Sequence, residues 1–141
     1  MRERALLFTD VVDSTRLVER LGDARAAEVW SALDRSAGEL LARHRGSEID
    51  RVDGFFLLFD DVAQAAQYAL AYHRTIADLG LGARVGLHVG AVTLRPNAAE
   101  DVARGAKPIE VEGLAKPCAA RSMGLARGGQ TYAFQRPIDY A

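Results

Sequence analysis

The chain has 141 residues, of which 49% are hydrophobic and 26% charged, and this composition suits one globular domain with a substantial core. The formal net charge of −1 excludes a broad basic surface for nucleic acid, and Cys118, as the only cysteine, excludes an internal disulfide or a cysteine metal cluster. No stretch approaches the roughly 18 apolar residues of a membrane span, and the N-terminus lacks a signal-peptide pattern, so we expect a cytoplasmic protein without membrane contacts.

A strand and two helices are predicted at the start of the chain. Residues 5–8 form an apolar run typical of a buried strand, and the polar residues 13–15 are typical of a helix start. A Gly-Asp pair at 22–23 predicts a break before a second helix, whose apolar residues recur at helical spacing over 26–41. Asp10 stands between strand and helix, where it is either a turn or capping residue or an acid that binds the cation of a bound phosphate.

The middle of the chain alternates pairs of strands with a helix. Residues 47–52 and 55–59 predict two strands joined by an Asp-Gly hairpin turn. The alanine-rich residues 61–79 predict a helix, and residues 83–89 and 91–94 predict a second pair of strands on either side of a glycine.

The last third of the chain is less regular. Residues 95–108 have no clear periodicity and predict a loop or an arm, whereas residues 113–126 predict a helix and 129–134 a final strand. The complete order predicts an α+β domain of the α/β ferredoxin-like type, a βαββαβ sandwich with an antiparallel sheet and helices on one face.

Three other polar or reactive positions have simple structural interpretations. The pair Asp60-Asp61 is expected to end a strand and cap the following helix. His88 is expected to pack in the core or at a sheet edge, and Cys118 to behave as a small buried hydrophobic residue.

Five segments, FTDVVDST, GSEIDRVDGFFLLFD, ARVGLHVG, GLAKPCAAR and ARGGQTYAF, carry a family resemblance. In order and approximate spacing they resemble the catalytic domain of the class III nucleotidyl cyclases, which include adenylate and guanylate cyclases. The resemblance covers most of residues 4–134. It implies a single cyclase-homology domain over residues 1–141 that lacks the family's terminal strands, and a homodimer with active sites at the interface.

The resemblance also implies a reaction and a set of site residues. The ribose 3′-hydroxyl of a nucleoside triphosphate attacks its α-phosphate and expels pyrophosphate. Asp10 and Asp53 match the two aspartates that hold two divalent cations, Mg²⁺ or Mn²⁺. Arg121 matches the catalytic arginine that the partner protomer supplies. The expected phosphate-binding segment follows the first strand and comprises Val11, Val12, Asp13, Ser14 and Thr15.

Several positions depart from the family pattern. The hairpin EIDRVDG is one residue short, so that Asp50 or, without the gap, Ile49 stands at the base-selecting lysine position. Neither Asp50 nor Ile49 donates a charged hydrogen bond to a purine, and Glu110 replaces an aspartate at the second base-selecting position. Pro117 stands four residues before Arg121, where the family has asparagine, and offers neither an amide side chain nor a backbone N–H.

Two hypotheses about function follow. The first is a signalling domain that converts a nucleoside triphosphate to a cyclic nucleotide with weak or lost activity, and the paired aspartates favour it. The second is a catalytically degenerate domain that binds a nucleotide or only dimerises, and that serves as a sensor or regulatory module. Pro117 and the short hairpin favour the second, and Asp13 adds a negative charge where many relatives have glycine.

Overall fold

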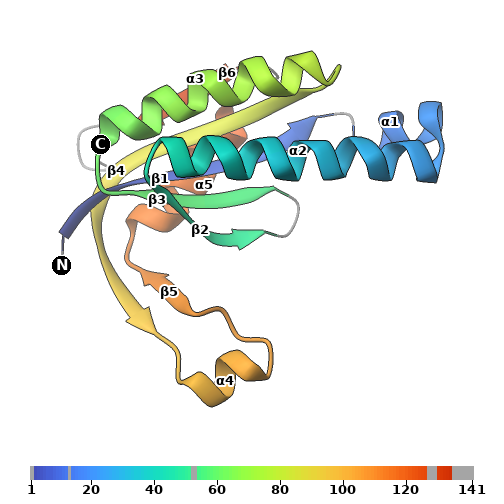
Figure 1. The fold of residues 1–141 in the computed structure, drawn as a ribbon. Coiled ribbons are helices and arrows are strands. Elements are labelled where there is room, and N and C mark those ends of the chain that lie inside the picture. Colours follow the sequence, from blue (N-terminus) through green and yellow to red (C-terminus); the bar gives the residue numbers. More distant parts are fainter. Residues whose placement is uncertain (1, 13, 52–53, 127–129, 135–141) are drawn as a thin grey trace.

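The computed structural model describes residues 2–12, 14–51, 54–126 and 130–134, the last three of these by their backbone only. Six strands and five helices lie within these residues (Figure 1). In chain order they are β1 (Arg2–Val12), α1 (Ser14–Leu21), α2 (Asp23–Arg43), β2 (Gly46–Arg51), β3 (Phe55–Phe59), α3 (Val62–Asp78), β4 (Gly82–Pro96), α4 (Ala99–Ala103), β5 (Ile109–Glu112), α5 (Ala115–Leu125) and β6 (Gln130–Phe134).

All six strands belong to one sheet, in which β1 lies at the centre. The order is β2-β3-β1-β4-β5, and β6 also pairs with β4. Every pairing is antiparallel except that of β4 with β6. This architecture confirms the predicted α+β domain with an antiparallel core.

The sheet has an apolar layer on each face. Ala5 and Leu7 of β1 pack with α2 and α3, whereas Leu6 packs with α5 on the opposite face. All five residues of β3, FFLLF, are buried, which is typical of a strand covered on both faces. The prediction that the helices share one face is therefore wrong, because α5 covers the second apolar surface of the sheet (Figure 1).

The strand β4 is continuous, although two strands separated by a glycine were expected. Gly90 pairs with Arg4 inside the ladder between β1 and β4. A Cβ at Gly90 would lie 2.8 Å from Cβ of Ala115 and 3.2 Å from Nε2 of His88. Glycine is required here because α5 approaches the strand closely, rather than because the chain turns.

Residues 93–112 form a projecting arm, which extends away from the sheet and the helices (Figure 1). The arm consists of the end of β4, the short helix α4 and the returning strand β5, which pairs with residues 93–96. Of the two expected alternatives for residues 95–108, a loop or an arm, the arm is confirmed. The strand β5, which follows this segment, was not predicted.

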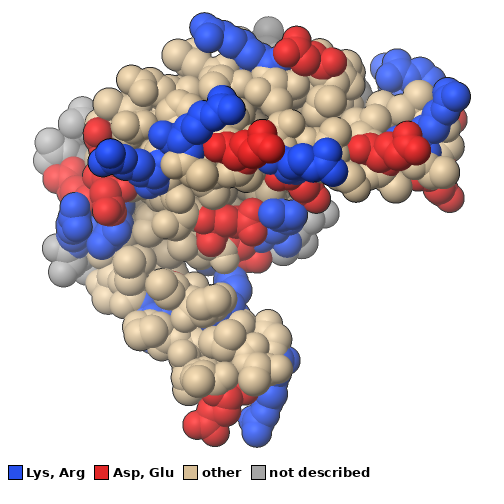
Figure 2. Space-filling model, viewed as in Figure 1, with Lys and Arg blue, Asp and Glu red and all other residues tan. Residues whose placement is uncertain are grey.

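Ion pairs fasten β2 to the helical layer. Arg51 lies 3.2 Å from Asp34 of α2 and 2.7 Å from Glu48 of its own strand. Arginine side chains alternate with acidic ones along α2 on the face shown in Figure 2. Charge on this face is therefore mixed along the helix instead of being separated by sign.

The structural interpretations of the isolated polar residues can be compared with their surroundings. Asp61 caps α3 by accepting a hydrogen bond from the backbone N–H of Ala63 at 2.9 Å, as expected. His88 is fully buried, which confirms its place in the core. The expectation that Cys118 is buried is wrong, because this residue of α5 is only partly buried, unlike its neighbour Ala119.

Gly86 of β4 lies directly under α5, since an added Cβ would be 2.1 Å from the backbone N of Met123. We expect Gly86→Ala to lower the free energy of unfolding by about 3 kcal/mol, because the helix must move. Gly38→Ala is the matched control: nothing lies within 4 Å of an added Cβ, and alanine favours the helix by about 0.5–1 kcal/mol. Urea unfolding followed by circular dichroism measures both, and equal effects would contradict the close packing of α5.

Candidate functional site

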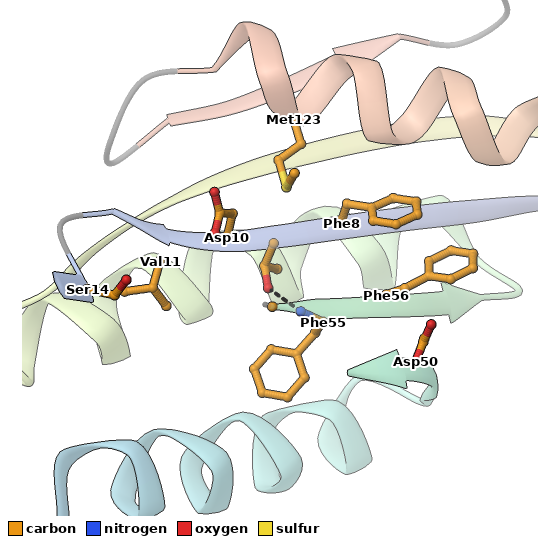
Figure 3. A pocket seen from close by; sticks show the side chains of 10 residues that line it. Phe8, Asp10, Val11, Ser14, Asp50, Phe55, Phe56 and Met123 are labelled. Carbon is orange, nitrogen blue, oxygen red and sulfur yellow. Dashed lines mark hydrogen bonds between the residues drawn. The ribbon is translucent and has the colours of Figure 1, made fainter. Parts of the chain in front are cut away.

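A pocket of about 600 Å³ opens where β1 separates from the β2–β3 hairpin (Figure 3). The pairing of β1 with β3 ends at Phe8 and Phe56, and the pocket lies beyond these residues. Its lining comes from β1, α1, β2, β3 and α5, and comprises Phe8, Thr9, Asp10, Val11, Ser14, Asp50, Gly54, Phe55, Phe56 and Met123.

Two close contacts set the width of the pocket. The hydroxyl of Thr9 accepts a hydrogen bond from the backbone N–H of Phe55 at 3.0 Å, in place of a further ladder bond (dashed in Figure 3). A Cβ at Gly54 would lie 1.9 Å from the carbonyl oxygen of Thr9 and 3.3 Å from Cα of Asp10. Only glycine allows the start of β3 to come this close to β1.

Asp10 lies within β1, which continues to Val12, so the interpretation of this acid as a turn or capping residue is wrong. The sequence suggested that the strand ends at Asp10, but β1 continues for two more residues, to Val12. Asp10 is directly opposite Arg84 of β4, and Arg84 donates to its carboxylate at 2.5 Å. Their side chains are 27% and 35% exposed, and of the two only Asp10 lines the pocket.

The predicted phosphate-binding segment is only partly at the pocket. Val11 and Ser14 line it, and Ser14 is the first residue of α1. Val12 instead ends β1 opposite Gly82 and lines a separate hollow beside α1, while Thr15 is exposed on that helix. Asp13 lies outside the described residues.

The two predicted base-selecting acids lie close together, joined by a residue that the sequence interpretation missed. Lys107 lies on the arm, 3.4 Å from Oδ2 of Asp50 and 3.1 Å from Oε1 of Glu110. The hydrogen bond with Lys107 lowers the pKa of Glu110, and the same bond raises the pKa of Lys107, so both are charged near neutral pH. No local pattern marked Lys107, because its segment lacks periodicity.

The remaining predicted residues are not part of this pocket as described. Arg121 is exposed on α5 and does not line it, although Met123 of the same helix does. Pro117 lies in the first turn of α5. Asp53 lies outside the described residues, and within the described ranges no three His, Cys, Asp or Glu side chains form a metal-binding group.

None of the helices in the described part of the chain is long and apolar enough to cross a membrane.

The solved structures that share this fold include class III adenylate and guanylate cyclase catalytic domains. The adenylyl cyclase CyaB from P. aeruginosa has a TM-score of 0.82 at 16% identity, over 94% of this chain and 76% of that one. A structure of adenylate cyclases from Trypanosoma brucei in their monomeric state has a TM-score of 0.80 at 22% identity, over 94% of this chain and 72% of that one. The guanylate cyclase domain of RhGC from Catenaria anguillulae, in complex with GTP, has a TM-score of 0.79 at 15% identity, over 94% of this chain and 78% of that one.

In sequence, the chain matches no family model and no curated protein. The structural likeness nevertheless covers nearly the whole chain and agrees with the resemblance of the five sequence segments. The chain therefore has the fold of a class III nucleotide cyclase catalytic domain.

Thr9 is expected to be essential for the junction of β1 and β3, because it is 3% exposed and satisfies a buried backbone N–H. We expect Thr9→Val to cost about 2 kcal/mol and to speed hydrogen exchange at the Phe55 amide, which loses its acceptor. Thr9→Ser keeps the hydroxyl and is the control. Unchanged exchange at Phe55 in Thr9→Val would contradict this role.

Proposed function

We propose that this chain is a cyclase-like signalling domain that binds a nucleoside triphosphate together with Mg²⁺ or Mn²⁺ in the pocket between Asp10 and Asp50. The single observation that carries the proposal is the placement of this pocket in a cyclase catalytic domain fold. Asp10 and Ser14 lie at one end and Asp50 at the other, with Phe8 and Phe56 along the wall between them (Figure 3).

The donor set at the Asp10 end suits a hard divalent cation. Asp10 offers carboxylate oxygens inside the pocket, and Gly54, which follows Asp53 in the chain, lies against the backbone of Asp10. Asp10 and Asp53 are the residues that would hold the cations. When bound, such cations offset the charge of the triphosphate and favour ionisation of the ribose 3′-hydroxyl.

Arg84 gives the same end of the pocket a positive group. At present it neutralises Asp10, and its Nε is buried without a hydrogen-bond partner in the described part of the chain. Once Asp10 ligates a cation, Arg84 is available to pair with a phosphate oxygen, which its guanidinium suits. Ser14, at the start of α1, adds unpaired backbone N–H groups of the helix N-terminus.

The proposed cyclisation is weak, because the reacting centre lacks one donor. Pro117 supplies no amide where the family has asparagine, and loss of one such positioned donor costs roughly 10²–10³ in rate. Arg121 is exposed and is not among the residues that line the pocket of its own chain, which supports action on the site of a partner protomer in a homodimer. Pro117 also favours the second candidate function, a nucleotide-binding regulatory module without turnover.

Purified protein should be incubated with ATP, GTP, CTP and UTP, each with Mn²⁺ and with Mg²⁺, and the products separated by chromatography. We expect a cyclic nucleotide whose formation falls at least about 100-fold in Asp10→Asn, which removes a charged cation ligand. Asp78→Asn, an exposed acid at the end of α3, is the control. Triphosphate binding without product would support the regulatory module, and absence of both would overturn the proposal.

The homodimer predicts that two inactive variants complement each other. In a two-fold dimer, each site takes Asp10 from one protomer and Arg121 from the other. Co-expressed Asp10→Asn and Arg121→Ala chains should therefore recover about a quarter of the wild-type activity, since half of the dimers are mixed and each has one intact site. Recovery no greater than the sum of the two single variants would show that Arg121 does not act across an interface.

A further inference from the structure

Four polar side chains from β2 and the arm meet at the Asp50 end of the pocket. Lys107 lies between Asp50 and Glu110, at 3.4 and 3.1 Å. Asn97 donates to the backbone carbonyl of Lys107 at 2.7 Å and to Oε2 of Glu110 at 3.4 Å. Asn97 therefore holds both the backbone that carries Lys107 and one of its partners. We call these four residues the Lys107 cluster.

The Lys107 cluster is more than an isolated surface ion pair. The side chains of Lys107 and Glu110 are 30% and 21% exposed, and Lys107 lies 57 positions from its partner Asp50 in the sequence. Exposed pairs of this type contribute little to stability. Two carboxylates share one ammonium here, so the cluster keeps a net negative charge and unused acceptors.

The hydrogen-bonding capacity of the cluster can be counted. An ammonium has three N–H groups, and two of those of Lys107 face Asp50 and Glu110, which leaves one. An ionised carboxylate has about four acceptor sites. Asp50 also accepts from the backbone N–H of Arg51 at 2.9 Å, so each acid keeps free acceptor sites. The cluster therefore offers one charged donor beside several acceptors.

This pattern is complementary to guanine. Guanine presents the acceptor O6 next to two donors, N1–H and the N2 amino group, so a lysine and a carboxylate satisfy all three. Adenine presents only one donor group, its N6 amino group, beside one acceptor on the same edge. A site with one cationic donor and surplus acceptors is better matched by guanine.

We propose that Lys107 reads the base of a bound nucleotide and that the Lys107 cluster prefers guanine to adenine. The inference rests on the proposed function, because it requires a nucleotide in the pocket. Asp50 belongs both to the pocket lining and to the cluster, and Phe8 and Phe56 give the adjoining wall an apolar surface (Figure 3). Lys107 then supplies, from the arm, the charged donor that Asp50 cannot.

The test is calorimetric binding of GTP, ITP and ATP, with inorganic triphosphate as the probe of the Asp10 end, all in the presence of Mn²⁺. We expect GTP to bind about tenfold or more tightly than ATP, with ITP between them because it lacks the N2 amino group. Lys107→Ala should weaken GTP binding about 10- to 100-fold and leave inorganic triphosphate binding unchanged.

Two matched variants separate base recognition from a bracing role for Lys107. Arg104→Ala removes a positive charge from the same arm. The Arg104 side chain is exposed and makes no ion pair among the described residues, so this variant should change neither the affinity for GTP nor the preference for GTP over ATP. The exchange Asp50→Lys with Lys107→Asp restores one lysine between carboxylates and should recover much of the GTP preference.

The outcomes distinguish this inference from the function on which it rests. If Lys107→Ala weakens all nucleotides equally, or none of them, Lys107 only braces the arm and the inference is overturned while the proposed function stands. Tighter binding of ATP than of GTP overturns the choice of guanine. A folded protein that binds neither nucleotides nor inorganic triphosphate overturns the proposed function, and the inference with it.

Discussion

The antiparallel pairing of β1 with β4 is the constraint on which the pocket depends. It runs without interruption from Arg2 opposite Val92 to Val12 opposite Gly82. Side chains directly opposite each other share a face of the sheet, so this register places Asp10 beside Arg84. Beyond β1, the same strand β4 continues into the arm that carries Lys107 back to β2. The long strand β4 thus positions both the Arg84–Asp10 pair and, through the arm, the Lys107–Asp50 pair.

The elements that the sequence predicted well are those whose burial imposes a period on their side chains. The helices α2 and α3 are of this kind, because their apolar residues face a continuous core. The strand β3 could be predicted for another reason, since it is an unbroken apolar run in which all five residues are buried. Gly90 misled the interpretation because a glycine in a strand indicates a turn and a close approach equally well. The four residues of β5 include only one that is buried, Val111, which is too little periodicity to distinguish a strand from a loop.

The site could be predicted only where a local segment carried the signal. Asp10 and Asp50 belong to segments that resemble the cyclases, and both line the pocket. Arg84 and Lys107 have partners 74 and 57 positions away in the sequence. Nothing local to an arginine or a lysine identifies such a partner, since the pairing results from strand register and from the return of the arm. The basic half of the site therefore required the tertiary structure.

The charges around the pocket give a physical reason for its proposed dependence on a cation. Two basic groups and three acids face it or adjoin it: Arg84, Lys107, Asp10, Asp50 and Glu110. Their sum is negative, and Arg84 is already paired with Asp10, so the Asp10 end offers no uncompensated positive charge to a polyanionic triphosphate. A divalent cation on Asp10 would make that end positive and would free Arg84 from its partner. The proposed base end needs no such exchange, because a neutral ring would be bound there through hydrogen bonds. On this argument the metal governs binding of the phosphates, and the arm governs the identity of the base.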